Sequence, residues 1–124
     1  MKGTDNSHTD DLMELVIEGL SRKKGKRIVT LDLSKIENAI CDYFVIAHGD
    51  STTQTEALGA SVEDIIKENI KTNPYHKEGF ENAQWILLDY GDIIVHIFLD
   101  SYRTLYNLED LWADAEYKLI EEAV

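Results

Sequence analysis

Two apolar segments separated by a glycine-containing tight turn constrain the fold of this chain more than any other feature. The first segment covers residues 84–90, the turn is Gly91-Asp92, and the second segment covers residues 93–99. Both segments are rich in β-branched and aromatic side chains, which favour strands, and a glycine between two such segments is typical of a β-hairpin. The pattern therefore predicts two antiparallel strands joined by a short turn.

Helices and other strands are predicted on both sides of this hairpin. Ser51 and Gln54 have the spacing of a capping box at the start of a helix, and Pro74 ends that helix because proline disfavours helical backbone in the residue before it. Gly25 is expected to close the first helix in a left-handed conformation. Apolar periodicity predicts further helices over 10–24, 102–106 and 108–120 and strands over 27–33 and 42–47. Residues 72–82, after the helix that ends before Pro74, are predicted to form a loop.

The resulting order of elements is α-β-β-α-β-β-α. Strands mixed with crossover helices indicate a small single-domain α/β sandwich with a mixed β-sheet flanked by helices, and not a doubly wound Rossmann unit. A length of 124 residues fits one domain, with a polar, flexible N-terminal segment over 1–9 and the folded domain over 10–124. One cysteine and no apolar stretch of about twenty residues predict a cytoplasmic protein without a membrane partner.

Charge is distributed unevenly along the chain. The formal net charge is −12, which argues against a nonspecific grip on nucleic acid and predicts no direct DNA binding. Residues 78–124 contain 11 acids and 2 bases, whereas five of the 12 bases lie between Arg22 and Arg27. This basic segment is explained either by the end of the first helix, where cations are favourable, or by contact with RNA phosphates.

The predicted hairpin brings aromatic and acidic side chains close to one turn. Trp85, Asp89, Tyr90 and Asp92 all lie in or beside this turn, and an acidic surface with aromatic side chains suits a basic protein partner. Strand alternation places Trp85 and Asp89 on one face and Tyr90 on the other. The hairpin is therefore a candidate partner-binding site, and a simple surface turn is the alternative.

Enzymatic chemistry finds little support in the sequence. The turn Gly49-Asp50-Ser51, between a strand and a helix, resembles the glycine-serine turn with which nucleotidyltransferases hold a triphosphate. Those enzymes also need two carboxylates on a following strand to hold magnesium, and the nearest later pair, Asp89 and Asp92, straddles a turn. We therefore expect a protein that is not an enzyme and has no cofactor, with nucleotide binding at this turn as the alternative.

Histidines and the cysteine show no metal or nucleophile pattern. His8, His48, His76 and His96 are scattered without metal-ligand spacing, and His96 is expected inside the second hairpin strand with a neighbouring partner. Cys41 has no histidine or base nearby in the sequence that would activate its thiol. No metal site is predicted.

Three segments in the same order closely resemble the ribosomal silencing factor family, also called Iojap. They are residues 42–54 (DYFVIAHGDSTTQ), 85–98 (WILLDYGDIIVHIF) and 103–112 (RTLYNLEDLW). The resemblance extends from the first helix to Asp114. His48 and Asp50 depart from the small or neutral residues that are more usual beside this glycine, and nothing is transferred to the C-terminal residues 113–124.

This resemblance implies a protein that binds the large ribosomal subunit through ribosomal protein L-fourteen and sterically prevents the small subunit from joining, so that translation falls when nutrients are scarce. It implies a nucleotidyltransferase-like topology without catalytic carboxylates, and a possible homodimer. Leu108 and Trp112 match the third segment but lie on the apolar row of the predicted C-terminal helix, so we assign them to packing. The residues that the resemblance implies for the ribosome-facing surface are Trp85, Asp89, Tyr90, Asp92, His96, Arg103 and Tyr106.

Overall fold

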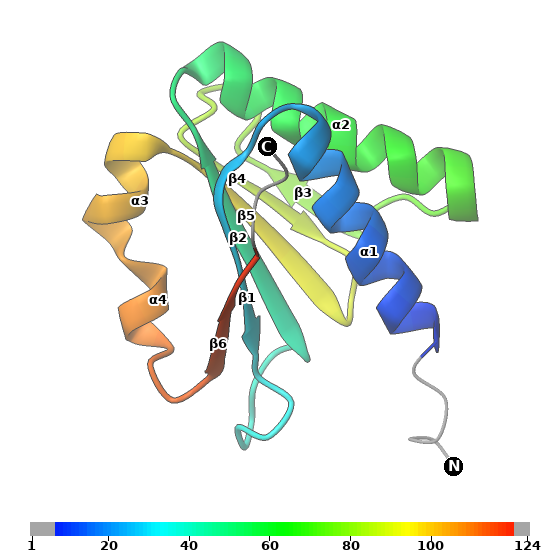
Figure 1. Ribbon diagram of the computed structural model, residues 1–124, viewed down its shortest axis with the longest axis vertical. Helices are drawn as coiled ribbons and strands as arrows, with labels where there is room; N and C mark the ends of the chain where they lie inside the picture. Colours follow the sequence, from blue (N-terminus) through cyan, green and yellow to red (C-terminus); the bar gives the residue numbers. More distant parts are fainter. Residues whose placement is uncertain (1–6, 121–124) are drawn as a thin grey trace.

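The computed structural model describes residues 7–120, which form one mixed sheet of six strands with helices on both of its faces (Figure 1). The predicted α/β architecture is confirmed. Among the described residues no helix is both long and apolar enough to cross a bilayer. In chain order the elements are α1 (Ser7–Arg22), β1 (Lys26–Asp32), β2 (Tyr43–Gly49), α2 (Thr52–Ile70), β3 (His76–Glu78), β4 (Trp85–Asp89), β5 (Ile93–Leu99), α3 (Asp100–Tyr106), α4 (Leu108–Leu111) and β6 (Glu116–Leu119).

The strand order is β3-β4-β5-β2-β1-β6, with one parallel pair at its centre. Strands β2 and β5 run parallel, with Tyr43 opposite Ile93 and Gly49 opposite Leu99, and every other neighbouring pair is antiparallel. The two central strands therefore end at the same edge of the sheet. Helix α2 begins at that edge directly after β2, and α3 begins there directly after β5.

The hairpin β4–β5 forms as predicted. The amide of Tyr90 donates to the carbonyl of Ile93 at 2.9 Å, and Gly91 takes the positive φ of 89° that a glycine tolerates best. The Asp89 carboxylate accepts the Gly91 amide at 2.8 Å and so stabilises the turn. Alternation along β4 buries Ile86 and Leu88 against one layer of helices and leaves Trp85 partly exposed on the other face.

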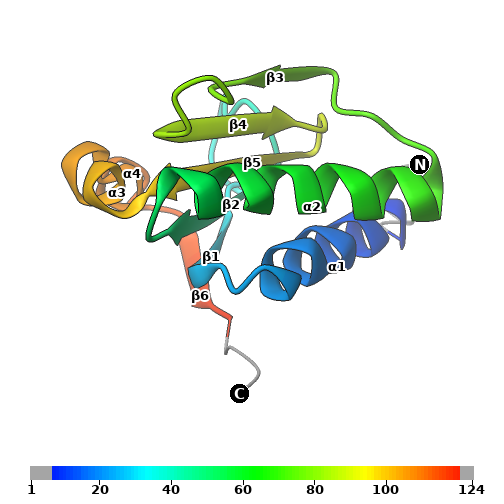
Figure 2. The ribbon, with the colours of Figure 1, turned by 90° about the horizontal axis from the view of Figure 1, so that it is seen from above.

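Two helical layers cover the two faces of the sheet unequally. Figure 2 shows α1 and α2 side by side on one face and the short helices α3 and α4 on the other. Helices α1 and α2 pack closely because Gly19 has no side chain, since a Cβ there would lie 2.9 Å from the Cα of Val62. The Ser61 hydroxyl also donates to the Gly19 carbonyl at 2.7 Å. This layer encloses most of the core, whereas α3 and α4 cover only part of the other face.

Helix ends differ in detail from the prediction. Helix α1 begins at Ser7, so residues 7–9 of the segment expected to be flexible are helical, and residues 1–6 lie outside the described part. The left-handed residue after α1 is Lys24, with φ 62°, and not Gly25. Gly25 is needed instead for packing, because a Cβ there would meet the Leu20 carbonyl oxygen at 3.1 Å. The predicted cap of α2 is confirmed, since the Ser51 hydroxyl accepts the Gln54 amide at 3.1 Å.

Two predicted segments are wrong. Residues 76–78 of the predicted loop form β3 on β4, and the predicted C-terminal helix over 108–120 ends at Leu111. The chain then turns back and β6 pairs with the outer edge of β1, with Leu119 opposite Val29. Pairing satisfies the backbone groups of β1, which a helix could not do, and thus outweighs the helical periodicity. The assignment of Leu108 and Trp112 to packing is confirmed, since Leu108 is buried and the Trp112 ring packs edge-on against Phe44.

We expect Gly79→Ala to destabilise the fold far more than Gly91→Ala. Both glycines have a positive φ, of 91° and 89°, so both variants carry the same backbone strain of about 1 kcal/mol. A Cβ at Gly79 would also lie 1.9 Å from the carbonyl oxygen of Trp85, whereas one at Gly91 meets only the exposed ring of Tyr75. Urea unfolding of the two variants is expected to differ by at least about 2 kcal/mol, and equal losses would contradict this account.

Candidate partner-binding surface

The predicted site residues separate into groups at the two ends of the hairpin. Trp85 begins β4 opposite Phe98, whereas Asp89 ends β4 opposite Ile94 and Asp92 lies in the turn. Asp89 follows Trp85 by four positions along the strand, which corresponds to about 13 Å. The aromatic and acidic side chains of the hairpin therefore do not form one cluster around the turn.

Aromatic rings gather at the end of the hairpin where α3 begins. The ring of Trp85 lies 4.7 Å from that of Tyr106 and 5.0 Å from that of Phe98, and Tyr102 stacks beside Tyr106 at 6.3 Å. Tyr106 is 50% exposed, and Trp85 and Tyr102 are partly exposed. A pocket of about 130 Å³ opens between these rings and the loop that precedes β4.

Two further large apolar side chains of the short helices are exposed, Leu105 in α3 at 69% and Leu111 in α4 at 75%. Neither leucine was a site candidate in the sequence, where this segment was predicted only as helix. We call the exposed side chains of these helices, together with the tryptophan beneath them, the arm surface. It consists of Trp85, Tyr102, Leu105, Tyr106 and Leu111.

His96 lies beneath the arm surface and orients Trp85. Its side chain is only 4% exposed, and its Nδ1 accepts the indole Nε1 proton of Trp85 at 3.1 Å. Burial lowers the pKa of His96 from 6.5 to about 3, so the ring is neutral and its proton sits on Nε2. That Nε2 has no hydrogen-bond partner among the described residues. His96 is thus inaccessible from outside and contributes to this surface through the tryptophan that it orients.

Tyr90 and the two hairpin carboxylates have local structural contacts. Tyr90 is buried on the face covered by α1 and α2, as strand alternation predicts, and burial raises the pKa of its phenol. Asp89 is partly exposed and caps the Gly91 amide, while Asp92 is exposed and accepts the hydroxyl proton of Thr9 at 2.9 Å. Of these three residues only the two carboxylates are accessible to a partner.

Arg103 is buried and joins α3 to strands β1 and β2. It is 5% exposed, and its Nε and Nη2 donate to one carboxylate oxygen of Glu109 at 3.1 and 2.7 Å. Its Nη1 donates to the carbonyl of Arg27 at 2.8 Å and to Nδ1 of His48 at 3.0 Å. Sequence reasoning missed Glu109, because the left-handed Asn107 between α3 and α4 redirects the chain and no helical spacing links the pair.

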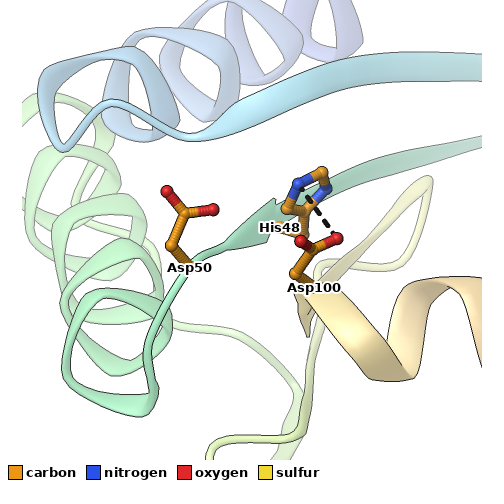
Figure 3. A group of neighbouring side chains, drawn as sticks. All are labelled: His48, Asp50 and Asp100. Atoms are coloured by element: carbon orange, nitrogen blue, oxygen red, sulfur yellow. Dashed lines mark ion pairs between the residues drawn. The ribbon is translucent and has the colours of Figure 1, made fainter.

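One group of side chains in the described part has the composition of a metal site. It consists of His48, Asp50 and Asp100, whose possible ligand atoms lie within 4.8 Å of one another (Figure 3). The parallel pairing of β2 and β5 brings Asp100 beside His48, a proximity that the sequence alone does not show. A neutral histidine can bind a metal only through a nitrogen that carries no proton.

Proton placement argues against a cation in this group. Arginine only donates, so the bond from Arg103 makes Nδ1 of His48 the acceptor and leaves the proton on Nε2, which lies 3.5 Å from Asp100. Burial and the positive charge of Arg103 lower the pKa of His48, which keeps the ring neutral. Lys26 already pairs with Asp50 at 3.4 Å. The donor set therefore fits a network of polar contacts better than a metal site.

The turn Gly49-Asp50-Ser51 is also built for packing and not for a triphosphate. A Cβ at Gly49 would lie 2.9 Å from the amide nitrogen of Thr55, so the glycine permits close contact with α2. The Asp50 amide, which could hold a phosphate, donates instead to the Gln54 side chain at 2.7 Å. The carboxylates Asp89 and Asp92 lie at the other end of the hairpin, about 20 Å away along the strands.

We expect Arg103→Met to destabilise the protein by about 3–5 kcal/mol, because Glu109 would keep a partly buried charge without its partner. The double variant Arg103→Met/Glu109→Met removes both charges and is expected to recover part of this loss. Urea unfolding of the two variants measures the difference. A double variant no more stable than Arg103→Met would contradict a buried ion pair.

The stability of the protein is expected to fall as the pH is lowered from about 6.5 towards 4. Folded His96 stays neutral in this range because its pKa is about 3, whereas the same side chain takes up a proton in the unfolded chain. This difference contributes about 1.4 kcal/mol per pH unit. His96→Phe is expected to flatten the dependence by that amount in urea unfolding at several pH values. His8→Phe, at an exposed position in the first turn of α1, is the control.

Comparisons with known proteins agree with this geometry. The family described as "Ribosomal silencing factor during starvation" matches residues 6–123. A ribosomal silencing factor RsfS of Halalkalibacterium halodurans is 37% identical over 108 residues, covering 85% of this chain and 88% of that protein. A mouse protein called mitochondrial assembly of ribosomal large subunit protein 1 is 30% identical over 78% of this chain and 43% of its own length.

A solved structure shows the same fold. The crystal structure of a Chromobacterium violaceum protein superposes with a TM-score of 0.79 at 36% identity, and the match covers 93% of this chain and 92% of that one. The family resemblance inferred from three sequence segments is thus confirmed over nearly the whole chain, and with it the expectation of a protein that is not an enzyme. The chain belongs to the ribosomal silencing factor RsfS family.

Proposed function

We propose that this protein binds the large ribosomal subunit through ribosomal protein L-fourteen and sterically prevents the small subunit from joining, which lowers translation under nutrient limitation. Its family is described as silencing ribosomes during starvation, and the name of its mouse relative refers to the large subunit. The protein transforms no substrate in this mechanism. Occupancy of a surface that the small subunit needs is sufficient, and the site of action is the cytoplasm.

The observation that carries the proposal is the arm surface, where aromatic and aliphatic side chains lie exposed beside carboxylates. Residues 100–117 contain five acids and one base, and that base, Arg103, is buried and paired with Glu109. Exposed Asp100, Asp110 and Asp114 therefore leave this part of the molecule negative. Exposed apolar side chains on an acidic segment complement a basic ribosomal protein.

The two kinds of side chain contribute differently to binding. Burial of Trp85 and Tyr106 against a partner supplies most of the affinity, because large aromatic side chains lose much apolar surface to water and little conformational entropy. The indole of Trp85 is already held by its hydrogen bond to His96, which lowers the entropy lost on binding. The carboxylates accelerate and orient the encounter, and added salt weakens that effect.

The residues implied by the family resemblance take distinct roles in this proposal. Trp85 and Tyr106 contact the partner directly. His96 and Arg103 are positioning residues, since both are buried and hold the arm surface in place. Asp89 and Asp92 lie at the far end of the hairpin and reach only a partner that extends along it, and Tyr90 serves the core.

We expect Tyr106→Ala to weaken binding to isolated large subunits by at least about tenfold, because it removes an exposed ring that packs against Trp85. Tyr117→Ala is the matched control, since Tyr117 is equally exposed at 50% but lies on β6. Cosedimentation with large subunits measures both affinities. Equal losses in the two variants, or none in either, would exclude the arm surface from the interface.

A subunit-joining assay with purified components tests the silencing step itself. Increasing amounts of the wild-type protein are expected to reduce the joining of small to large subunits, and Tyr106→Ala is expected to require a higher concentration for the same effect. Saturating protein that leaves joining unchanged would overturn the proposal.

Equilibrium dialysis with magnesium and nucleoside triphosphates tests the nucleotide-binding alternative, for which we expect no specific binding.

Self-association is a further part of the proposal. The family resemblance implies a possible homodimer, and both edge strands of the sheet, β3 and β6, are exposed. An exposed edge strand can pair with a second chain. Sedimentation velocity over a range of protein concentrations distinguishes a dimer from a monomer.

A further inference from the structure

The segment between α1 and β1 is basic in an otherwise acidic molecule. We call residues 22–27 the basic turn, because they contain five bases. Arg22 pairs with Glu18 at 2.8 Å and Lys26 pairs with Asp50 at 3.4 Å. Lys23 and Lys24 are exposed and form no ion pair with any carboxylate of residues 7–120. Two ammonium groups therefore remain available to an external anion.

Helix capping does not account for these two lysines. The carbonyls of Leu20 and Ser21 at the end of α1 accept the backbone amides of Gly25 and Lys24, at 2.8 and 3.0 Å. The carbonyls of Lys23 and Lys24 both accept the side-chain amide of Gln54, at 3.1 and 3.0 Å. Backbone and glutamine donors thus satisfy these four carbonyls at the end of α1 and in the basic turn, and neither lysine side chain takes part. The side chains of Lys23 and Lys24 are exposed and form no hydrogen bond or ion pair within residues 7–120.

The basic turn is held firmly in place. Gln54 in the first turn of α2 joins it to the start of that helix, and Gly25 is buried against Leu58. Lys24 has a left-handed backbone with φ 62°, a conformation that glycine adopts at lower cost. A fixed backbone lowers the entropy that is lost when the lysines bind a ligand.

The basic turn and the arm surface lie at the same end of the sheet. Figure 1 shows the turn between α1 and β1 at the end where α3 begins. Arg103 connects them directly, because it lies in α3 and donates to the carbonyls of Lys26 and Arg27 at 3.3 and 2.8 Å. One rigid end of the molecule thus presents an acidic apolar surface and, next to it, a basic one.

We propose that the basic turn binds phosphates of ribosomal RNA while the arm surface binds a neighbouring ribosomal protein. The inference rests on the function proposed above and adds a second class of ligand to it. Lysines gain affinity for RNA by releasing the cations condensed on its phosphates. Two such contacts are weak by themselves. Once the arm surface is bound to the ribosomal protein, however, the two lysines are held close to the neighbouring RNA, which gives them a high effective concentration there. The net charge of −12 then selects against RNA that lacks the neighbouring basic protein.

Glycine substitutions test this proposal without disturbing the backbone. Lys24→Gly removes one ammonium group and relieves the left-handed conformation, so the thermal stability is expected not to fall. Lys71→Gly is the matched control, since Lys71 is exposed, left-handed with φ 56° and placed after α2, at the opposite end of that helix from the basic turn. Affinity for isolated large subunits is measured by cosedimentation at several salt concentrations.

We expect Lys24→Gly combined with Lys23→Ala to weaken binding and to make the slope of log affinity against log salt less steep, by about 0.7–0.9 for each phosphate that the variant no longer binds. Lys71→Gly is expected to leave the affinity and the slope unchanged. If the wild-type protein binds and both sets of variants behave like it, the basic turn does not touch the RNA and this inference is wrong. A wild-type protein that does not bind large subunits would overturn the proposed function as well.

Crosslinking separates RNA from a protein partner. A photoreactive group is attached to Lys23→Cys, and Lys71→Cys serves as the control. Cys41 does not compete for the reagent, because it is buried and burial raises the pKa of its thiol to about 11. Crosslinks from position 23 to ribosomal RNA in isolated large subunits support the proposal. Crosslinks from position 23 to protein alone, or none while the protein still cosediments, would overturn it.

Discussion

The parallel pairing of β2 with β5 at the centre of the sheet determines where every surface of interest lies. Because both strands end at one edge, α2 and α3 begin there, and the antiparallel neighbours β1 and β4 must start there. Arg103, Trp85 and the basic turn are thereby brought to the same end of the molecule from segments far apart in the sequence. Asp89 and Asp92 lie at the opposite end, where they take part in contacts of the hairpin turn and of α1.

A buried arginine makes this end of the sheet a single unit. Arg103 donates to Glu109 and to two carbonyls of β1, and so joins the short helices α3 and α4 to the basic turn. Its charge is compensated inside the protein, which leaves the carboxylates around the arm surface unneutralised. Neighbouring surfaces of opposite charge suit a target in which protein and RNA lie side by side.

Local patterns predicted most of the elements, and the errors share a cause. The hairpin, the capping serine of α2 and the mixed sheet depend on short-range preferences and on burial, which a sequence expresses directly. The C-terminal segment has helical periodicity, yet residues 116–119 pair with β1. Without this pairing the backbone groups at the outer edge of β1 would lack partners, which becomes apparent only once the sheet is assembled. Likewise the site residues were grouped by their nearness to one turn, whereas the strand length separates Trp85 from Asp89.

The sequence by itself determined the α/β class, the hairpin, the uneven charge and the resemblance to ribosomal silencing factors, because each depends on residue types and spacings along the chain. Only the tertiary structure decided which of the implied site residues are accessible. Burial of His96, Tyr90 and Arg103, and exposure of Leu105, depend on which elements pack over each strand. The physical reason is that exposure and charge compensation depend on residues that are close in space but distant in sequence. Glu109 compensates the charge of Arg103, and Gln54 binds the backbone of the basic turn.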